Sequence, residues 1–242
     1  MITVNLQGGI GNTLFQYAYA RTLTLCGVQL YNACNQYGCQ LERFNIKLPF
    51  TKRPEGRWIS ERGLTYDQNP EVDNPCVLNG YWQCENYFRH ITDNIKEEFT
   101  LKEEPSVQAK QYADEINKTK NSVMVHVRRG DYLTWARERH GVLPVEYYIQ
   151  AAKHFTDPHF FLFSDDPSCS IPFPHTRVSC LPHEDLWLMS KCKNAVIANS
   201  SFSWWGAWLG ADATGTVIAP KKWFAKGNED SRDIVPSRWT QI

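Results

Sequence analysis

The side chains best suited to catalysis or anion binding follow the segment SVMVHV at residues 122–127. The alternating valines of this segment predict a buried strand. Arg128 and Arg129 come directly after it, and two adjacent guanidinium groups form a fork that suits a diphosphate. Asp131 would place a carboxylate beside the bond that is broken. The alternative is a surface turn whose arginines pair with exposed acids, and this segment alone does not decide between the two.

Two later predicted strands also end on polar residues. Asp165 and Asp166 follow the apolar run FFLFS, and a serine-rich helix start with Ser201 and Ser203 follows the run AVIA. Hydroxyl and N–H groups at a helix N-terminus bind anions, although serine is also a common N-cap. Ligands of open α/β sheets bind outside the carboxyl ends of the strands. We therefore expect the three strand ends to converge on one ligand-binding crevice.

Several residues permit more than one role. The pair Asp165-Asp166 is able to bind Mg²⁺, but the chain has no Asp-x-Asp spacing, and a metal-free site that uses arginine cations is the simpler account. Asp185 opens a predicted helix, either as its N-terminal cap or as an acceptor for the two donors of a guanine edge. Trp204 and Trp208 lie four apart on one helix face, which favours core packing over stacking on a sugar.

The composition excludes several classes of protein and site. With 242 residues and 42% apolar side chains, the chain is able to bury a sizeable core in one large domain or two small ones. The zero net charge argues against nucleic-acid binding. The eight cysteines contain no C-x-x-C pair and the seven histidines no H-E-x-x-H motif, so neither zinc nor a disulfide framework is expected. Without a signal-peptide pattern or an apolar run of ~18 residues, we expect a cytoplasmic protein with free thiols.

The elements that must position these residues change in character along the chain. The beginning predicts a strand at residues 2–6, a glycine turn at 8–12 and a helix at 13–25, whereas residues 32–80 lack periodicity and predict loops and short elements. A polar surface helix is predicted at 106–120.

From residue 121 onward, apolar strands alternate with helical patterns, as in βαβ units with a parallel sheet. The predicted strands cover residues 122–127, 159–163, 194–198 and 216–219, and the predicted helices cover 145–155, 184–191 and 203–210. We therefore expect two domains, at residues 1–120 and 121–242.

Four segments, GGIGNTLFQYAYA, HVRRGDY, FSDDPSC and CKNAVIANSSFSWWGAWLG, occur in the same order as in a known family. Together with PKKW near the end, they resemble the bacterial α-1,2-fucosyltransferases of glycosyltransferase family 11 over most of the chain. The resemblance implies an α/β fold of the GT-B-like type, with two Rossmann-type domains that contain parallel sheets, the N-terminal one smaller and irregular. It further implies inverting, metal-independent transfer of L-fucose from GDP-β-L-fucose to the 2-hydroxyl of a galactoside in a surface glycan or oligosaccharide, with no cofactor.

The resemblance also implies roles on the donor side, in the domain at 121–242. Arg128 would neutralise the β-phosphate as GDP leaves, and Arg129 would contact the phosphates or support the structure. His126 would lie near the nucleotide, and Asp185 is similar to a carboxylate that reads guanine. Asp165 is counted among the donor-binding residues as well.

Two further groups complete the predicted donor site. Ser201, Phe202 (through its backbone) and Ser203 would hold the pyrophosphate. The domain at 1–120, on the acceptor side, would present to the cleft the glycine-turn residues Gly9, Asn12 and Gln16.

The base that removes the acceptor proton is the least determined part of the site. Asp131 is the first candidate because it closely follows the phosphate-binding arginines, and an inverting displacement needs such a base. Glu138 and His140 in the following loop compete with it, and Asp131 is equally able to form a salt bridge that orients Arg128. Trp135, Glu138 and His140 are the candidates for contact with the acceptor.

The expected partners are GDP-fucose and a galactose-containing glycan, not nucleic acid. Peripheral membrane association through a lipid-linked acceptor is compatible with this interpretation. Two alternatives stay open: a fucosyltransferase of different linkage or acceptor, and a catalytically silent sugar-binding protein.

Overall fold

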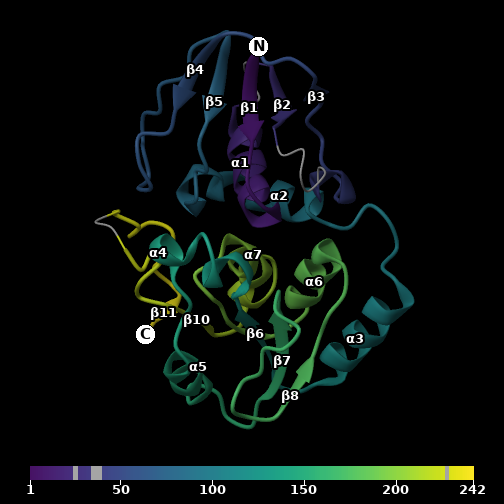
Figure 1. Cartoon of the computed structure of the whole chain (residues 1–242). Helices are drawn as coiled ribbons and strands as arrows, with labels where there is room; N and C mark the ends of the chain where they lie inside the picture. The colour runs from purple at the N-terminus through teal and green to yellow at the C-terminus, as the bar shows by residue number, and fades with distance from the viewer. Residues whose placement is uncertain (24–26, 34–39, 227–228) are drawn as a thin grey trace. The chain divides into compact units, whose positions relative to one another are not determined.

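The computed structural model describes residues 1–23, 27–33, 40–226 and 229–242. The chain forms two compact units (Figure 1). Unit 1 consists of Met1–Glu103 together with Glu229–Pro236, and unit 2 consists of Glu104–Asn228 together with Ser237–Ile242. The division after Glu103 differs from the expected boundary at residue 120, because the helix that precedes residue 120 belongs to unit 2.

Unit 1 contains a parallel sheet of five strands in the order β3-β2-β1-β5-β4. The strands are β1 (Ile2–Leu6), β2 (Val28–Asn32), β3 (Phe50–Thr51), β4 (Arg57–Ser60) and β5 (Cys76–Asn79). All five residues of β1 are buried, in agreement with its place at the centre of the sheet (Figure 1). The helical elements are α1 (Ile10–Thr22), α2 (Thr92–Glu98) and the 3-10 turns η2 (Gln40–Arg43), η3 (Glu85–Tyr87) and η4 (Arg89–Ile91).

The turn between β1 and α1 requires glycine at one position. Gly8 has a φ of +80°, and a Cβ atom there would overlap the side chain of Asn12. The left-handed conformation and the close approach are both accessible to glycine alone without strain. The predicted glycine turn is therefore present, and α1 begins three residues earlier than the predicted helix at 13–25.

Unit 2 contains a parallel sheet of six strands in the order β11-β10-β9-β6-β7-β8. The strands are β6 (Ser122–Val127), β7 (His159–Ser164), β8 (His175–Arg177), β9 (Asn194–Val196), β10 (Val217–Ala219) and β11 (Thr240–Gln241). The helical elements are α3 (Val107–Lys118), α4 (Arg137–His140), α5 (Val145–Ala152), α6 (Pro182–Met189), α7 (Ser201–Leu209) and the 3-10 turns η5 (Gly130–Leu133) and η6 (Ala211–Ala213).

The core of unit 2 explains why β6 is central. Every residue of β6 is buried, and its three valines belong to the apolar cluster that includes Tyr147 and Tyr148 of α5. Alternate residues of a strand point to opposite faces, so His126 points away from this cluster, and its ring lies 5.6 Å from that of Phe202 in α7. The strand thus carries the core on one face and leads into the polar residues at its carboxyl end.

Two parallel α/β units confirm the predicted fold class. Core packing of the tryptophans is also confirmed, since Trp204, Trp205 and Trp208 of α7 are buried and their rings contact one another. The five cysteines in the described part of the chain are free thiols. None of the helices that the described residues form combines the length and the apolar character that a membrane span needs.

Candidate active site

Arg128 leaves the carboxyl end of β6 and is held between two carboxylates. Its Nη2 donates a hydrogen bond to Oδ1 of Asp131, and its Nη1 donates one to Oδ2 of Asp165, both at 2.5 Å. The guanidinium also lies 5.2 Å from the centre of the Tyr132 ring. The side chain of Arg128 is 31% exposed, so the guanidinium remains accessible to a ligand. The two carboxylates fix its orientation in advance.

The parallel register of β6 and β7 brings Asp165 to this position. Val127, the last residue of β6, is paired with Ser164, the last residue of β7, so the residues that follow the two strands meet. Oδ1 of Asp165 accepts a hydrogen bond from the backbone N–H of Arg129 at 2.8 Å. A Cβ atom at Gly130 would overlap Oδ2 of the same carboxylate, which explains the need for glycine there.

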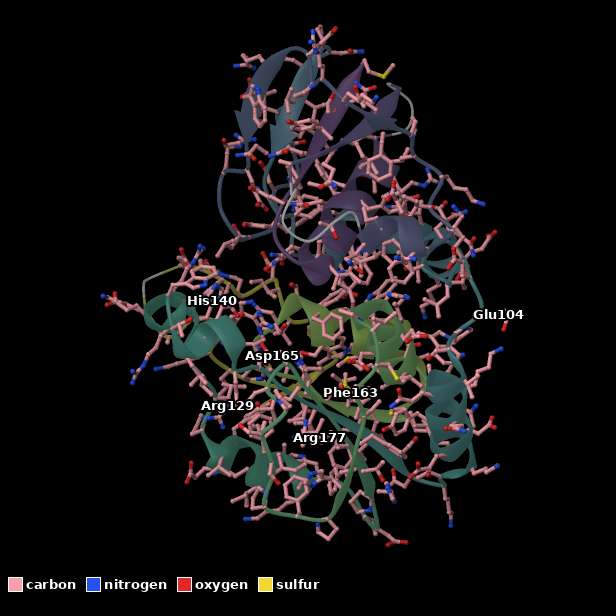
Figure 2. All side chains as sticks on the ribbon, turned by 45° about the vertical axis from the view of Figure 1, so that its right-hand side comes forward. Glu104, Arg129, His140, Phe163, Asp165 and Arg177 are labelled. Atoms are coloured by element: carbon pink, nitrogen blue, oxygen red, sulfur yellow. The ribbon has the colours of Figure 1, made fainter. Side chains whose placement is uncertain are left out.

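Arg129 forms the second half of this cluster. Its Nε lies 3.1 Å from Oδ2 of Asp166, and Figure 2 shows Arg129 and Asp165 on neighbouring segments. Hydrogen bonds from Ser168 to Oδ1 of Asp166 hold the pKa of that carboxyl below its usual value. The arginines therefore do pair with acids, as one of the two interpretations required; Asp165 and Asp166 belong to the neighbouring strand end, and Asp131 follows the arginines on the same segment.

The serines at the beginning of α7 form hydrogen bonds within the helix start. Ser200 caps the helix, because its Oγ accepts a hydrogen bond from the N–H of Phe202 at 3.3 Å. Ser203 is buried, and its hydroxyl donates to the carbonyl of Ser200, so the expected side-chain contact with pyrophosphate does not agree with this arrangement. Ser201 and Phe202 lie in the first turn of α7, where the N–H of Phe202 is bonded to the Ser200 cap.

His126 is neutral at physiological pH. Burial, reinforced by the nearby charge of Arg128, lowers the pKa of His126 to about 3. Its Nδ1 is buried and has no hydrogen-bond partner among the residues that the structure describes. His126 is therefore unable to balance the charge of a phosphate, and hydrogen bonding is the role that its imidazole retains.

A polar network that sequence reasoning missed supports the loop after β6. The hydroxyl of Tyr132 donates to the carbonyl of Asn199 at 3.0 Å, and the Tyr132 ring stacks on His140 at 4.6 Å. Nδ2 of Asn199 donates to the carbonyls of His140 at 2.9 Å and Trp223 at 3.1 Å. The loops after β6, β9 and β10 are thereby tied together. The only signal in the sequence was the position of Tyr132 directly after the Arg-Arg-Gly-Asp run.

The candidate acceptor residues lie outside this ion cluster. Trp135 is 82% exposed, and Glu138 forms a surface ion pair with Lys226, with 2.9 Å between the charged atoms. His140 packs between the rings of Tyr132 and Phe224. Of the three candidate bases, Asp131 is the one with a hydrogen bond to Arg128.

Asp185 lies within α6 and is not its N-terminal cap, which is Leu181. Its Oδ1 accepts a hydrogen bond from the N–H of Cys180 at 2.9 Å. Burial raises the pKa of Asp185 to about 7, which outweighs the opposite effect of this hydrogen bond. If Asp185 contacts guanine, the N–H groups of the guanine would have to donate hydrogen bonds that stabilise the ionised form of the Asp185 carboxyl group.

The predicted residues of the glycine turn lie in unit 1. Gly9 is the N-cap of α1, and Oδ1 of Asn12 accepts a hydrogen bond from Nε2 of Gln83 at 2.7 Å. The expectation for Gln16 was wrong, because its side chain is 0% exposed and donates to the carbonyl of Gly80 at 2.7 Å. Gln16 therefore holds α1 to the segment after β5 instead of facing a ligand.

The described residues contain no group of three His, Cys, Asp or Glu side chains that is arranged to hold a metal ion. The prediction that the site works without a metal stays a prediction. Of the Asp165-Asp166 pair, Asp166 forms an ion pair with Arg129 and accepts a hydrogen bond from Ser168. Asp165 forms an ion pair with Arg128.

Comparisons with known proteins agree with the sequence resemblance. The model of the family described as glycosyl transferase family 11 matches residues 67–242. An α-1,2-colitosyltransferase of Escherichia coli is 32% identical, over 100% of this chain and 99% of the relative. Galactoside α-(1,2)-fucosyltransferase 1 of Oryctolagus cuniculus is 24% identical, over 88% of this chain and 65% of the relative.

Solved structures show the same fold. A crystal structure of fucosyltransferase NodZ from Bradyrhizobium matches with a TM-score of 0.57 at 15% identity, over 86% of this chain and 92% of that chain. A crystal structure of the α-1,6-fucosyltransferase NodZ soaked with GDP-fucose matches with a TM-score of 0.55 at 16% identity, over the same shares of both chains. The two parallel-sheet units thus have a GT-B-like architecture, and the chain is a glycosyltransferase that belongs to glycosyltransferase family 11.

Proposed function

We propose that the chain transfers L-fucose from GDP-β-L-fucose to the 2-hydroxyl of a galactoside, with inversion and without a metal. The observation that carries this proposal is Arg128, which is fixed at the end of β6 by Asp131 and Asp165 and remains partly exposed. The relatives support the chemistry by name, since α-1,2 transfer occurs among them and one structural neighbour was soaked with GDP-fucose.

The first part of the proposed mechanism concerns the leaving group. Departure of GDP builds negative charge on the β-phosphate while the fucose becomes oxocarbenium-like. The guanidinium of Arg128 would stabilise that charge. Because two carboxylates already orient the guanidinium, little reorganisation is needed during the reaction. Loss of one such preorganised donor costs about 3–4 kcal/mol of transition-state stabilisation.

The second part concerns the acceptor proton. Oδ1 of Asp131 receives the hydrogen bond from Arg128, whereas Oδ2 has no hydrogen-bond partner among the described residues. We propose that Oδ2 takes the proton of the acceptor hydroxyl as it attacks the fucose in a single displacement. The two roles considered for Asp131, orientation of Arg128 and general base catalysis, then fall to different oxygens of one carboxylate.

A second candidate donor follows from the relative that is 32% identical, whose name specifies transfer of colitose. Colitose is L-fucose without the 3-hydroxyl, so a site that does not hydrogen-bond this group would accept both sugars. GDP-colitose and GDP-fucose compared at equal concentration would identify the natural donor. A strong preference for GDP-colitose would replace fucose in the proposal and leave the roles of Arg128 and Asp131 unchanged.

The experiment that tests the proposal measures GDP release from GDP-fucose in the presence of EDTA, with and without lactose. We expect release that depends on lactose, and a product in which the fucose is linked to the 2-hydroxyl of galactose. Release that requires a divalent metal would contradict the metal-free mechanism. Binding of GDP without release would retain the donor site and direct the search to other acceptors, including lipid-linked glycans at a membrane surface. The cytoplasmic location stays a prediction as well.

A further inference from the structure

Unit 1 contains a pocket of about 330 Å³ that has no part in the donor chemistry proposed above. It is formed by the end of β4 and the following loop, together with α1 and the segment after β5. Its volume lies at the lower end of the range of ~300–1,000 Å³ that is typical of small-molecule sites. The pocket is therefore large enough for a small ligand and too small for a folded partner.

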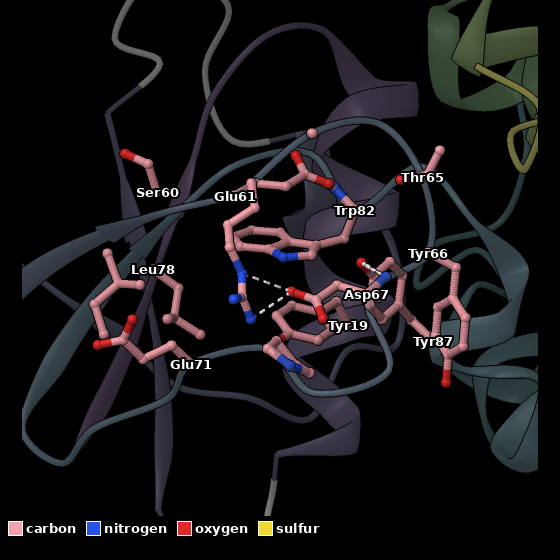
Figure 3. Close-up of a pocket in the computed structure, with 14 residues that line it drawn as sticks. Tyr19, Ser60, Glu61, Thr65, Tyr66, Asp67, Glu71, Leu78, Trp82 and Tyr87 are labelled. Carbon is pink, nitrogen blue, oxygen red and sulfur yellow. Dashed lines mark hydrogen bonds and ion pairs between the residues drawn. The ribbon is translucent and has the colours of Figure 1, made fainter. Parts of the chain in front are cut away.

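Aromatic rings form one wall of this pocket. Figure 3 shows the indole of Trp82 above the ring of Tyr19, and the two rings are stacked with their centres 4.6 Å apart. Tyr87 meets Tyr19 edge-on at 5.1 Å, and Tyr66 meets Tyr87 in the same way at 4.9 Å. These contacts lock the rings in place, so the wall is preformed.

A carboxylate holds the wall in an unusual backbone conformation. Trp82 has a φ of +50°, which residues other than glycine seldom adopt. Glu61 stabilises this turn, since its two oxygens accept the N–H groups of Tyr81 at 2.7 Å and Trp82 at 2.9 Å. Side-chain atoms at Gly80 would overlap Glu61, so glycine permits the approach. Strained residues of this kind cluster at ligand sites.

Hydroxyl groups line the same space. Tyr19 is 2% exposed as a whole residue and is one of the lining residues. Burial raises the pKa of Tyr19, so the phenol stays a neutral donor. Ser60 and Thr65 add two further hydroxyl groups to the lining. Each of these hydroxyls is able to donate a hydrogen bond to a polar ligand and to accept one from it.

The charges of the pocket select against anions. Glu61, Asp67 and Glu71 contribute three carboxylates, whereas the lining contains one guanidinium, that of Arg62. Nε of Arg62 already donates to Oδ2 of Asp67 at 2.9 Å, and Glu71 is paired with Arg57 outside the lining. A phosphate or a carboxylate ligand would meet a net negative surface. Carboxylates and phenols instead suit a ligand that carries several hydroxyl groups.

We propose that this pocket binds a neutral pyranose of a glycan, with the C–H groups of the ring against the aromatic wall and the hydroxyls on Tyr19, Glu61 and Asp67. The pocket would then be a glycan subsite in unit 1, separate from the ion cluster in unit 2. The identification of the glycan as the acceptor rests on the proposed function; the binding of a neutral pyranose does not. A cage for an organic cation is disfavoured because Tyr19 and Trp82 stack on each other and expose no open face between them.

The test is ligand-observed NMR on the full chain in the absence of GDP-fucose, with lactose, 3′-sialyllactose and choline as probes. We expect saturation transfer to lactose and little transfer to the other two. In the variant Tyr19→Phe, lactose affinity should fall about three- to tenfold, which is the effect of one net hydrogen bond. Calorimetry should give the same GDP affinity for the variant and the wild type.

Tyr31→Phe is the matched control, because Tyr31 is also a tyrosine of unit 1 and does not line the pocket. This variant should bind lactose like the wild type. Absence of lactose binding, equal lactose affinity in Tyr19→Phe and wild type, or choline binding that Tyr19→Phe weakens would each overturn the proposal. Lactose binding that depends on Tyr19 in a chain without transferase activity would retain the pocket and contradict the proposed function instead.

Discussion

The ion cluster of unit 2 and the pocket of unit 1 use charge in opposite ways. In unit 2, Arg128 and Arg129 are paired with aspartates whose side chains remain partly exposed, so the cations are oriented and still accessible. In unit 1, Glu61 is largely withdrawn from solvent, and its oxygens hold backbone N–H groups behind an aromatic wall. The first arrangement suits a diphosphate, and the second suits a neutral ligand that is rich in hydroxyls.

This difference indicates how one chain could distinguish two substrates that both contain sugars. The nucleotide part of a donor carries the negative charge, so a cluster with cations recognises it and a pocket with excess carboxylates rejects it. A neutral acceptor forms no ion pair with the arginines, because it has no charge. The following predictions test whether the two regions are independent in this way.

The largest expected effect is on turnover in Arg128→Ala. Removal of the guanidinium eliminates the cation that we propose to stabilise the leaving group, and it leaves the carboxylates of Asp131 and Asp165 without their partner. We expect kcat/KM to fall about 10³-fold in the GDP-release assay, with the fold retained by circular dichroism. Lactose binding measured by NMR should not change. Near-normal turnover would exclude the proposed phosphate role, and Arg43→Ala in unit 1 serves as the control.

Asp131→Asn should lower the catalytic rate without lowering the affinity for GDP. If Oδ2 of Asp131 is the base, kcat should fall about 10²-fold or more, whereas the GDP affinity measured by calorimetry should change little. Asp165→Asn is the matched variant, because it removes the other carboxylate that holds Arg128 and has no proposed role as a base. A loss of GDP affinity in Asp131→Asn as large as in Asp165→Asn would leave Asp131 with an orienting role alone.

The pH dependence of stability should reveal the buried state of Asp185. The folded protein raises the pKa of Asp185 from 3.8 to about 7, so between these values it binds more protons than the unfolded chain. This group therefore stabilises the fold below pH 4 and loses that contribution as the pH rises to 7, with an upper limit of about 4 kcal/mol. Asp185→Asn removes the dependence. Urea unfolding at pH 5 and pH 8 should show a smaller loss of stability in the variant.

His126 contributes the opposite slope, since its pKa in the folded protein is lowered to about 3 and its ordinary value is 6.5. Its contribution is lost as the pH falls through this window. The comparison of Asp185→Asn with the wild type cancels this contribution, because His126 is present in both. Parallel stability curves of the two proteins would contradict the raised pKa of Asp185.

The smallest effect is expected in Tyr87→Phe. The phenol of Tyr87 accepts the backbone N–H of Asp67 at 2.9 Å, and its loss leaves that N–H without its acceptor. We expect a decrease of about 1 kcal/mol in the free energy of unfolding and weaker lactose binding, with GDP affinity unchanged. A change in GDP affinity would show that the pocket and the ion cluster are coupled after all.

The second half of the fold was predictable because apolar segments alternate with helical patterns there. The segment at 122–127 matches β6 in both bounds, and the strands at 159–163, 194–198 and 216–219 correspond to β7, β9 and β10. Helices that pack on the sheet bury these strands. Because buried strands need apolar side chains, an apolar pattern is visible in the sequence at these positions.

The sheet of unit 1 was predictable only at β1. Strand β3 has two residues and β4 is mostly exposed, so neither carries an apolar pattern that local reasoning is able to detect. Their place in the sheet depends on pairing with β2 and β5, which are remote in sequence. Residues 32–80 therefore read as loops, although three of the five strands lie wholly within them.

The candidate sites show the same division. Arg128, Asp131 and Asp165 were found because the carboxyl ends of adjacent parallel strands meet by rule. Glu61 and Trp82 were missed because their contact joins two loops 21 residues apart, and no periodicity connects them. Tertiary contacts between irregular segments leave no local trace in a single sequence.

The short segment Glu229–Pro236 constrains any attempt to recombine this enzyme with a homologue. It follows most of unit 2 in the chain but belongs to unit 1, where Ile234 is fully buried and the carboxylate of Asp233 accepts the N–H of Tyr66 at 2.8 Å. A chimera with a single crossover near residue 103 would therefore exchange the carboxylate that holds the backbone of Tyr66, a lining residue of the pocket, together with unit 2. An exchange of whole units between homologues requires three junctions in the chain, so that residues 229–236 are exchanged together with the N-terminal unit.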